Sequence, residues 1–299
     1  MEREQGGTMM AAYTQIKEQP REQEVSRGAG IVLTVILTIL AVLFLIPVIL
    51  VLINSFKGKF YISDAPFALP GADTFVGLEN YTGGIAKTGF LSAIGYSLWI
   101  TVASVAVIVL LTSMTAWWIT RVKGWFSSIL YYLFVFAMIV PFQMVMFPMV
   151  KVANMLYLDN PAGIILIYLG FGAGMSVFMF CGFVKAIPLS LEEAAMIDGC
   201  GPIQIFFRVV WPILQPTAIT VAILNAMWIW NDYLLPYLVL GTDYKTIPIA
   251  VQYLQGGYGS IDMGAMMAVL VLVIIPIILF YLFCQKYIIS GVAAGAVKG

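Results

Sequence analysis

Six long runs of this chain contain no Asp, Glu, Lys or Arg, and they decide what the chain can fold into. A helix needs about 20 predominantly apolar residues to cross a bilayer, and every run is long enough. Charged residues make up 10% of the chain, against about 25% in soluble proteins. The runs are Ile31–Ile53, Leu91–Ile119, Trp125–Val150, Pro161–Val184, Val209–Asn231 and Met263–Gln285. The sequence therefore predicts an all-α membrane protein with six transmembrane helices, the fifth running on past Asp232 to about Leu240.

The basic residues predict the orientation of these spans. With the N-terminus inside, ten Lys and Arg residues fall in inner segments and five in outer segments, which agrees with the preference of basic residues for the inner side. The inner residues are Arg3, Lys17, Arg21, Arg27, Arg121, Lys123, Lys185, Arg208, Lys286 and Lys298. The outer residues are Lys57, Lys59, Lys87, Lys151 and Lys245. Both termini are then expected in the cytosol.

Three parts of the chain are expected. Residues 1–28 are polar and lack apolar periodicity, which predicts a disordered cytosolic tail. Residues 29–290 form the six-span membrane domain, with a cytosolic loop at 186–214. Residues 291–299 form a second cytosolic tail of small residues.

Several kinds of chemistry are disfavoured. The chain has no histidine, which removes His-ligated haem, most catalytic zinc sites and His-based acid–base catalysis. Its three cysteines (Cys181, Cys200 and Cys284) are far apart and form no Cys-x-x-Cys pair, so neither a metal site nor a disulfide framework is indicated. We therefore expect no catalytic residue, no metal and no cofactor in this chain.

The cytosolic loop around Ser190–Pro216 reads as two short helices. Ser190 followed by Glu193 has the spacing of a capping box, so a first helix is expected over Leu191–Asp198. Gly199 and Gly201 supply the stop, Pro202 can start a second helix, and Trp211-Pro212 is expected to end it. On these features alone, an interfacial helical hairpin joining two spans is the simpler interpretation.

The fifth span carries the most polar chemistry. Asn225, Trp228 and Asp232 are spaced i, i+3 and i+7 and share one helix face. An acid embedded in a span is costly and normally faces a protein interior or a water-filled path. In a continuous helix, Pro236 would also free the carbonyl of Asp232 as an additional acceptor. The alternative is that Asp232 reaches the outer interface and caps a neighbouring helix.

The loop also carries a recognisable signature. Glu193-Ala194-Ala195, then Gly199 three residues later, then Val209-x-Trp211-Pro212 resembles the pattern E-A-A-x3-G-x9-I-x-L-P of permease subunits of ABC importers. Val209 and Trp211 depart from the pattern but remain apolar. Asn54-Ser55-Phe56-Lys57, Trp230-Asn231-Asp232 and the closing stretch 293–299 resemble the carbohydrate-uptake branch. The resemblance implies a type I importer (MetI-like) permease fold in a prokaryotic plasma (inner) membrane.

The resemblance also implies partners and roles. The loop would be a coupling element, with Glu193, Ala194, Ala195, Asp198 and Gly199 docking in a cleft of a cytosolic ATPase. The chain has no Walker A pattern, so ATP and magnesium would be bound by two separate ATPase subunits. A second permease subunit, an extracytoplasmic sugar-binding protein and membrane lipid complete the expected partners, and no nucleic acid is expected.

Sugar contact is a separate hypothesis. Aromatic rings stack on sugar faces while Asn and Asp accept hydroxyl hydrogens, so Trp228, Asn231 and Asp232 are candidates for the substrate path, with Gln143 a more distant one. Two other functions stay open: an ABC permease for another small polar solute, and a stand-alone secondary transporter. The latter normally carries more intramembrane ionisable residues than this chain shows.

Overall fold

A computed structural model describes residues 27–252, 254 and 262–296. The predicted tail thus lies outside the described residues up to position 26. The described helices are α2 (Arg27–Asn54), α3 (Lys59–Asp64), α4 (Glu79–Thr88), α5 (Phe90–Arg121), α6 (Trp125–Ile139), α7 (Phe142–Met155), α8 (Gly163–Val184), α9 (Leu189–Ile197), α10 (Pro202–Ile205), the π-helix η1 (Phe206–Val210), α11 (Trp211–Asn231), α12 (Leu234–Leu240), α13 (Ile247–Gln252) and α14 (Met263–Ala296). Among the described residues the only β pairing is one isolated bridge, so the all-α prediction is confirmed.

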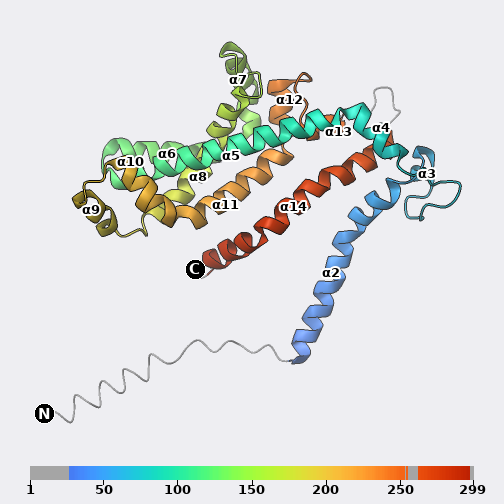
Figure 1. Ribbon diagram of the computed structural model, residues 1–299, viewed down its shortest axis with the longest axis horizontal. Helices are drawn as coiled ribbons and strands as arrows, with labels where there is room; N and C mark the ends of the chain where they lie inside the picture. The colour runs from blue at the N-terminus through green and yellow to red at the C-terminus, as the bar shows by residue number, and fades with distance from the viewer. Residues whose placement is uncertain (1–26, 253, 255–261, 297–299) are drawn as a thin grey trace, which may run out of the picture. The chain divides into compact units, whose positions relative to one another are not determined.

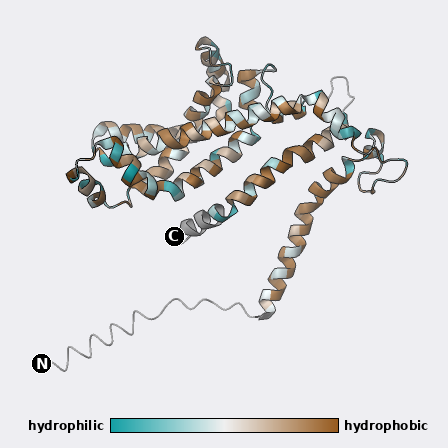
Figure 2. Ribbon diagram, in the orientation of Figure 1, coloured by the Kyte–Doolittle hydropathy of each residue, from teal (hydrophilic) through white to brown (hydrophobic). Residues whose placement is uncertain are grey.

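The predicted spans are found, but the third and the fifth are broken. Five described helices are long and apolar enough to cross a membrane, and α6 with α7 makes a sixth span only if the bent pair is counted as one. Figure 2 shows that these helices are mostly hydrophobic, while hydrophilic residues gather around α9 and α10 and around α3 and α4. The chain divides into two units, Met1–Leu50 and Val51–Gly299. The first unit holds most of α2, and everything described below belongs to the second.

The third span is not the single helix that the sequence predicts for the run Trp125–Val150. α6 stops at Ile139, α7 begins at Phe142, and the two helices are bent by 108° (Figure 1). Pro141 is the cause, because a proline has no N–H for the helical ladder and disfavours helical geometry in the residue before it. Val140 accordingly adopts an extended conformation, with ψ at 115°. The proline ends the helix instead of bending it.

The centre of the second unit is the packing of α5 on α8, with α6 and α11 alongside (Figure 1). Two glycines of α8 allow close approach: a Cβ at Gly174 would lie 2.8 Å from the Phe134 carbonyl oxygen of α6, and one at Gly172 would lie 2.8 Å from Asn225 Oδ1 of α11. Small residues such as glycine let membrane helices approach this closely. At one end of this core lie α9, α10 and η1, and at the other end lie α4 and α13.

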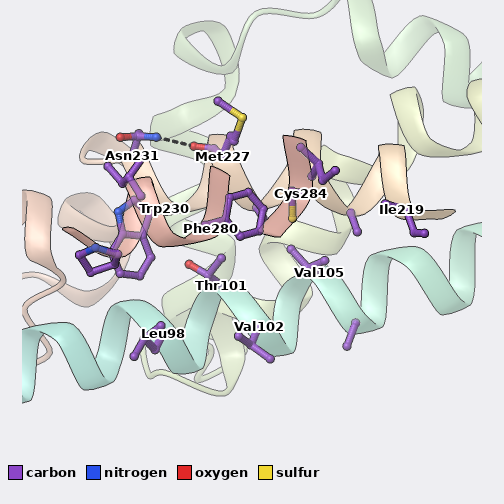
Figure 3. A pocket seen from close by; sticks show the side chains of 16 residues that line it. Leu98, Thr101, Val102, Val105, Ile219, Met227, Trp230, Asn231, Phe280 and Cys284 are labelled. Atoms are coloured by element: carbon purple, nitrogen blue, oxygen red, sulfur yellow. Dashed lines mark hydrogen bonds between the residues drawn. The ribbon is translucent and has the colours of Figure 1, made fainter. Parts of the chain in front are cut away.

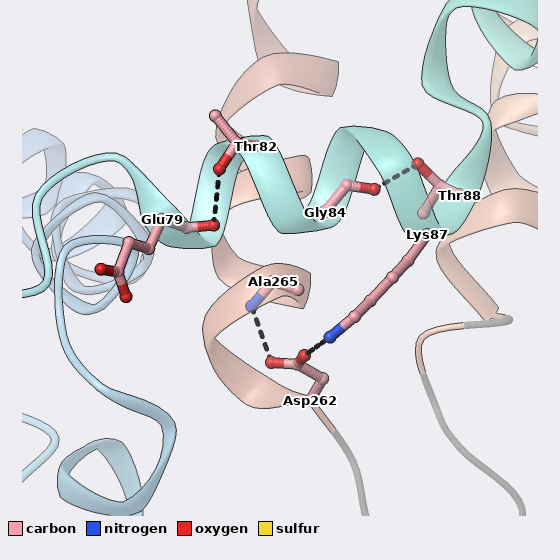
Figure 4. Close-up of polar contacts among 7 residues, drawn as sticks. All are labelled: Glu79, Thr82, Gly84, Lys87, Thr88, Asp262 and Ala265. Carbon is pink, nitrogen blue, oxygen red and sulfur yellow. Dashed lines mark hydrogen bonds and ion pairs between the residues drawn. The ribbon is translucent and has the colours of Figure 1, made fainter.

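The end opposite α9 is closed by α4 lying on α14 (Figure 4). A Cβ at Gly84 would lie 3.0 Å from the Ala265 carbonyl oxygen, so only glycine fits this crossing without a shift. The Lys87 ammonium pairs with Asp262, whose other oxygen accepts the Ala265 N–H at 3.1 Å. Burial raises the pKa of the Asp262 carboxyl, but Lys87 and the Ala265 N–H outweigh it and hold that pKa below its usual value. The pair joins α4 to the start of α14.

The last helix is longer than predicted. α14 continues through Ala296, so the first six residues of the predicted tail at 291–299 prolong the helix. Residues 297–299 lie outside the described part of the chain, as do 253 and 255–261 between α13 and α14.

Candidate functional site

The predicted loop forms a short helix, a glycine turn and a second helix. α9 covers Leu189–Ile197, and Gly199 follows with a φ of +79°, a left-handed conformation that glycine adopts without strain. Gly201 then precedes α10, where its N–H donates to the Gln204 side chain at 3.0 Å. The predicted helix, its glycine stop and the proline start of the second helix are therefore confirmed.

Two details of that prediction are wrong. Ser190 does not cap the helix with Glu193, because α9 already begins at Leu189 after Pro188 and has no side-chain cap. The second helix does not end at Trp211-Pro212 but runs through η1 into α11. The Trp211 N–H bonds to the Phe206 carbonyl five residues back, and this wider turn accommodates Pro212, which has no N–H to donate.

The predicted coupling residues lie mostly on an open surface. Glu193, Ala194, Asp198 and Gly199 are exposed. Ala195 is half-buried against the apolar cluster formed by α5, α8, α10, η1 and α11. Next to the exposed residues, Ile197 is 86% and Ile203 68% exposed, so large apolar side chains stand in the open beside a carboxylate. Such a mixed surface suits docking to another protein.

One residue of this helix was missed by the sequence analysis. Glu192 is only 3% exposed and forms an ion pair with Arg121 at 2.7 Å, where α5 ends. The sequence shows two adjacent acids and a basic residue at the end of the second span, but no spacing rule distinguishes Glu192 from Glu193 or pairs it with Arg121.

The fifth span also ends earlier than predicted. α11 stops at Asn231, Asp232 is extended with ψ at 123°, and α12 starts at Leu234, so no helix continues from α11 to Leu240. Asp232 Oδ1 accepts the N–H groups of Leu234 at 3.1 Å and Leu235 at 3.4 Å. The carboxylate thus caps the helix that follows it, and this cap makes the break favourable.

The three polar and aromatic residues that were expected to share one face of the fifth span do so, and this face contacts α8. Asn225, which is 1% exposed, donates to Ser176 Oγ at 3.2 Å, while Trp228 packs edge-on against Tyr168 with ring centres 5.5 Å apart. The Tyr168 hydroxyl donates to Asp232 Oδ2 at 3.1 Å. The residue that brings Trp228 and Asp232 together is therefore Tyr168, whose place in the fourth span gave no sign of this role.

The remaining candidates lie elsewhere. Asn231 is exposed, and it lines a cavity of about 480 Å³ between α5, α11 and α14 together with Trp230 and Thr101 (Figure 3). Its amide N–H₂ donates to the Met227 carbonyl at 2.7 Å. Gln143 is exposed on α7 and is not among the residues lining this cavity. The described residues contain no group of three or more His, Cys, Asp or Glu side chains placed to hold a metal ion.

The Tyr168–Asp232 contact leads to a first prediction. We expect Tyr168→Phe and Asp232→Asn to be non-additive, with a coupling of about 0.5–1.5 kcal/mol, the range of interhelical hydrogen bonds in membrane proteins. Tyr168→Phe keeps the ring and removes the hydroxyl donor, while Asp232→Asn can keep the cap through its amide oxygen and replaces the charged acceptor Oδ2 with an N–H₂ group, so both variants mainly change the shared bond. Unfolding of the purified protein in mixed detergent, for the two single variants and the double variant, measures the coupling. Additive losses would show that the two groups do not interact.

Comparison with known proteins gives one family match. Residues 108–293 match the family described as binding-protein-dependent transport system inner membrane component. A probable starch degradation products transport system permease of Thermoanaerobacterium thermosulfurigenes is 39% identical over 89% of this chain and 96% of its own length. A multiple sugar-binding transport system permease of Streptococcus mutans is 36% identical over 88% of this chain and 95% of its own.

A solved structure has the same fold. The crystal structure of a bacterial ABC transporter involved in the import of the acidic polysaccharide alginate contains a chain that matches with a TM-score of 0.74. The match covers 90% of this chain and 99% of that chain at 24% identity, which supports the fold and no finer point.

Proposed function

Because this chain belongs to the binding-protein-dependent transport system inner membrane components and is the permease of an ATP-driven sugar importer, we propose that α9 is its docking element for a separate ATPase. The exposed surface formed by Glu193, Ala194, Ile197 and Asp198 carries this proposal. Ala194 keeps the helix narrow enough to enter a cleft, Glu193 can accept hydrogen bonds from a basic partner, and Ile197 offers apolar area. Gly199 sets the angle between α9 and α10.

The proposed orientation places α9 in the cytosol. The ends of α5 and α8 and the η1 segment bring Arg121, Lys185 and Arg208 to the α9 end. Basic residues favour the cytosolic side of spans, so this end faces the ATPase, and both termini are cytosolic. The loops at the α4 and α13 end then face the sugar-binding protein.

The proposed complex has four kinds of protein chain. This permease pairs with a second permease to enclose the translocation path, and two ATPase subunits bind ATP and magnesium. An extracytoplasmic binding protein delivers the sugar. Closure of the ATPase pair moves the α9 elements, which changes the access of the path from one side of the membrane to the other.

For the substrate path we propose Trp228 and Asn231, whose side chains are exposed at the end of α11. We assign Asp232 a supporting role beside these two residues, because its oxygens already accept hydrogen bonds from the Tyr168 hydroxyl and two backbone N–H groups. Gln143 remains a more distant candidate on α7. Relatives transport starch degradation products, multiple sugars, arabinooligosaccharides and diacetylchitobiose, so we propose an oligosaccharide as substrate.

Copurification and uptake test this function together. The tagged permease, coexpressed with a second permease, an ATPase and a binding protein of the same organism, should retain the ATPase on an affinity column. Proteoliposomes containing the complex and its binding protein should take up one of a panel of radiolabelled sugars: maltotriose, arabinotriose, diacetylchitobiose or trehalose. Sugar uptake without any copurifying ATPase would favour a secondary transporter instead.

A further inference from the structure

The buried side of α9 is joined to α5 by a set of polar contacts centred on Glu192. Arg121 Nε donates to Glu192 Oε1 at 2.9 Å, and Arg121 Nη2 forms an ion pair with the same oxygen at 2.7 Å. The Trp117 indole N–H donates to Oε2 at 3.0 Å. Arg121 Nη2 also donates to the Ile187 carbonyl at 3.0 Å, just before α9 begins. Both carboxylate oxygens are thus held by side chains from the last turns of a single helix.

These contacts tie α9 to α5 more firmly than an exposed pair would. The Glu192 side chain is 5% and the Arg121 side chain 19% exposed, so water neither screens the pair nor replaces a lost partner. Arginine presents its N–H groups in a fixed planar fork, which fixes direction as well as distance. The Trp117 ring also packs on Phe206 of η1, with ring centres 5.6 Å apart. A shift of α9 relative to α5 would have to break these contacts together.

α9 therefore has two faces with different tasks. Glu193, Ala194 and Ile197 are exposed, whereas Glu192 is buried and Ala195 half-buried against the core. The adjacent acids point in different directions, because successive helix residues are about 100° apart. One face of α9 is exposed and can contact a partner, and the other face packs against the membrane domain.

α5 is suited to carry a movement from α9 across the protein. It is one unbroken helix of 32 residues, about 48 Å at 1.5 Å per residue. It packs along α8 and lines the cavity that also contains Asn231. Toward its other end, Ser97 Oγ accepts the Ile247 N–H of α13 at 2.8 Å. A displacement at Arg121 reaches both the cavity and the opposite end of the domain.

We propose that Glu192 and Arg121, with Trp117, are positioning residues that transmit the movement of the docked α9 into α5 during each transport cycle. This proposal rests on the proposed docking of the ATPase at α9. It separates two roles within one short helix: the exposed face receives the ATPase, and Glu192 passes the movement on.

The test uses the complete complex in proteoliposomes with its binding protein, and the sugar of the panel that the parent complex takes up fastest. Glu192→Gln keeps the size of the side chain but removes the charge that holds Arg121. We expect the ATPase to copurify and ATP hydrolysis to continue, while sugar uptake per ATP falls about tenfold, within the usual range of coupling between sites. Trp117→Phe keeps a ring beside Phe206 and removes one donor, so it should lower uptake per ATP less.

Ile197→Asp on the exposed face is the matched comparison. It should weaken copurification of the ATPase, whereas Glu192→Gln should not. Unchanged uptake per ATP in both Glu192→Gln and Trp117→Phe would overturn the proposal, and so would loss of the ATPase from the Glu192→Gln complex. If the Glu192→Gln protein does not insert into the membrane, the uptake per ATP of the Trp117→Phe complex alone tests the proposal. Normal copurification and uptake in Ile197→Asp would instead refute docking at α9, which is a separate failure.

Discussion

Replacing Gly199 with valine is expected to reduce sugar uptake at least about tenfold while the protein still inserts into the membrane. Gly199 has a φ of +79°, and a β-branched residue in that region costs about 1–3 kcal/mol, where 1.4 kcal/mol is a factor of ten. The chain relieves this strain by changing the turn between α9 and α10. That change redirects the exposed face of α9, which we propose fits a cleft in the ATPase.

Gly201 provides the control for this prediction, because it lies two residues away in the same turn. Its φ is −73°, and a Cβ at either glycine would meet nothing within 4 Å. Gly201→Val therefore tests the effect of added bulk without the backbone strain, and uptake should stay near the parent value. ATP-dependent uptake and the yield of the complex measure both variants. Equal losses at the two positions would mean that bulk, and not the left-handed turn, matters here.

Replacing Gly174 with valine is expected to destabilise the membrane domain by about 3 kcal/mol, at the upper end for overpacking a well-packed core. A Cβ at this position would lie 2.7 Å from Met138 Cγ and 2.8 Å from the Phe134 carbonyl oxygen. Side chains can turn aside, but the Phe134 carbonyl belongs to the backbone of α6. The seam between α6 and α8 must therefore open.

The control for Gly174 lies one turn earlier on the same helix. A Cβ at Gly170 would have no neighbour within 4 Å, so Gly170→Val changes the helix propensity of α8 equally without the clash. Detergent unfolding and the yield of folded protein compare the two variants. A Gly170→Val protein as unstable as Gly174→Val would assign the loss to helix propensity instead of packing.

The loop that contains α9 and α10 shows which features of the fold follow from neighbouring residues alone. The start of α10 at Pro202 and the stop of α9 at Gly199 follow from the properties of single residues, and both were predicted. The start of α9 and the course of the chain past Pro212 were predicted wrongly. The π turn at η1 places Phe206 in the core against Trp117 and Trp211, and this packing comes from α5, which is remote in the sequence.

The two broken spans show the limit of counting apolar residues. The run Trp125–Val150 was expected to form one helix, but Pro141 ends that helix, and the 108° turn depends on where α7 packs afterwards. At Asp232 the polar residue was recognised, and capping of a neighbouring helix was one of two alternatives, but the break in the span and the cap on α12 were not predicted. The role of Asp232 depends on the Tyr168 hydroxyl of α8 and on the N–H groups at the start of α12. The sequence of the fifth span alone does not reveal either partner.

The sequence by itself determined the class of this protein, its apolar spans, the position of the α9 turn and its family. Those properties depend on the composition and order of neighbouring residues, since the bilayer selects long uncharged runs and glycine selects left-handed turns. Only the tertiary structure decided which of two adjacent acids is buried and where the polar face of α11 points. Burial and hydrogen bonding depend on what a distant segment presents, and here Arg121 and Trp117 of α5 bury Glu192 and leave Glu193 exposed.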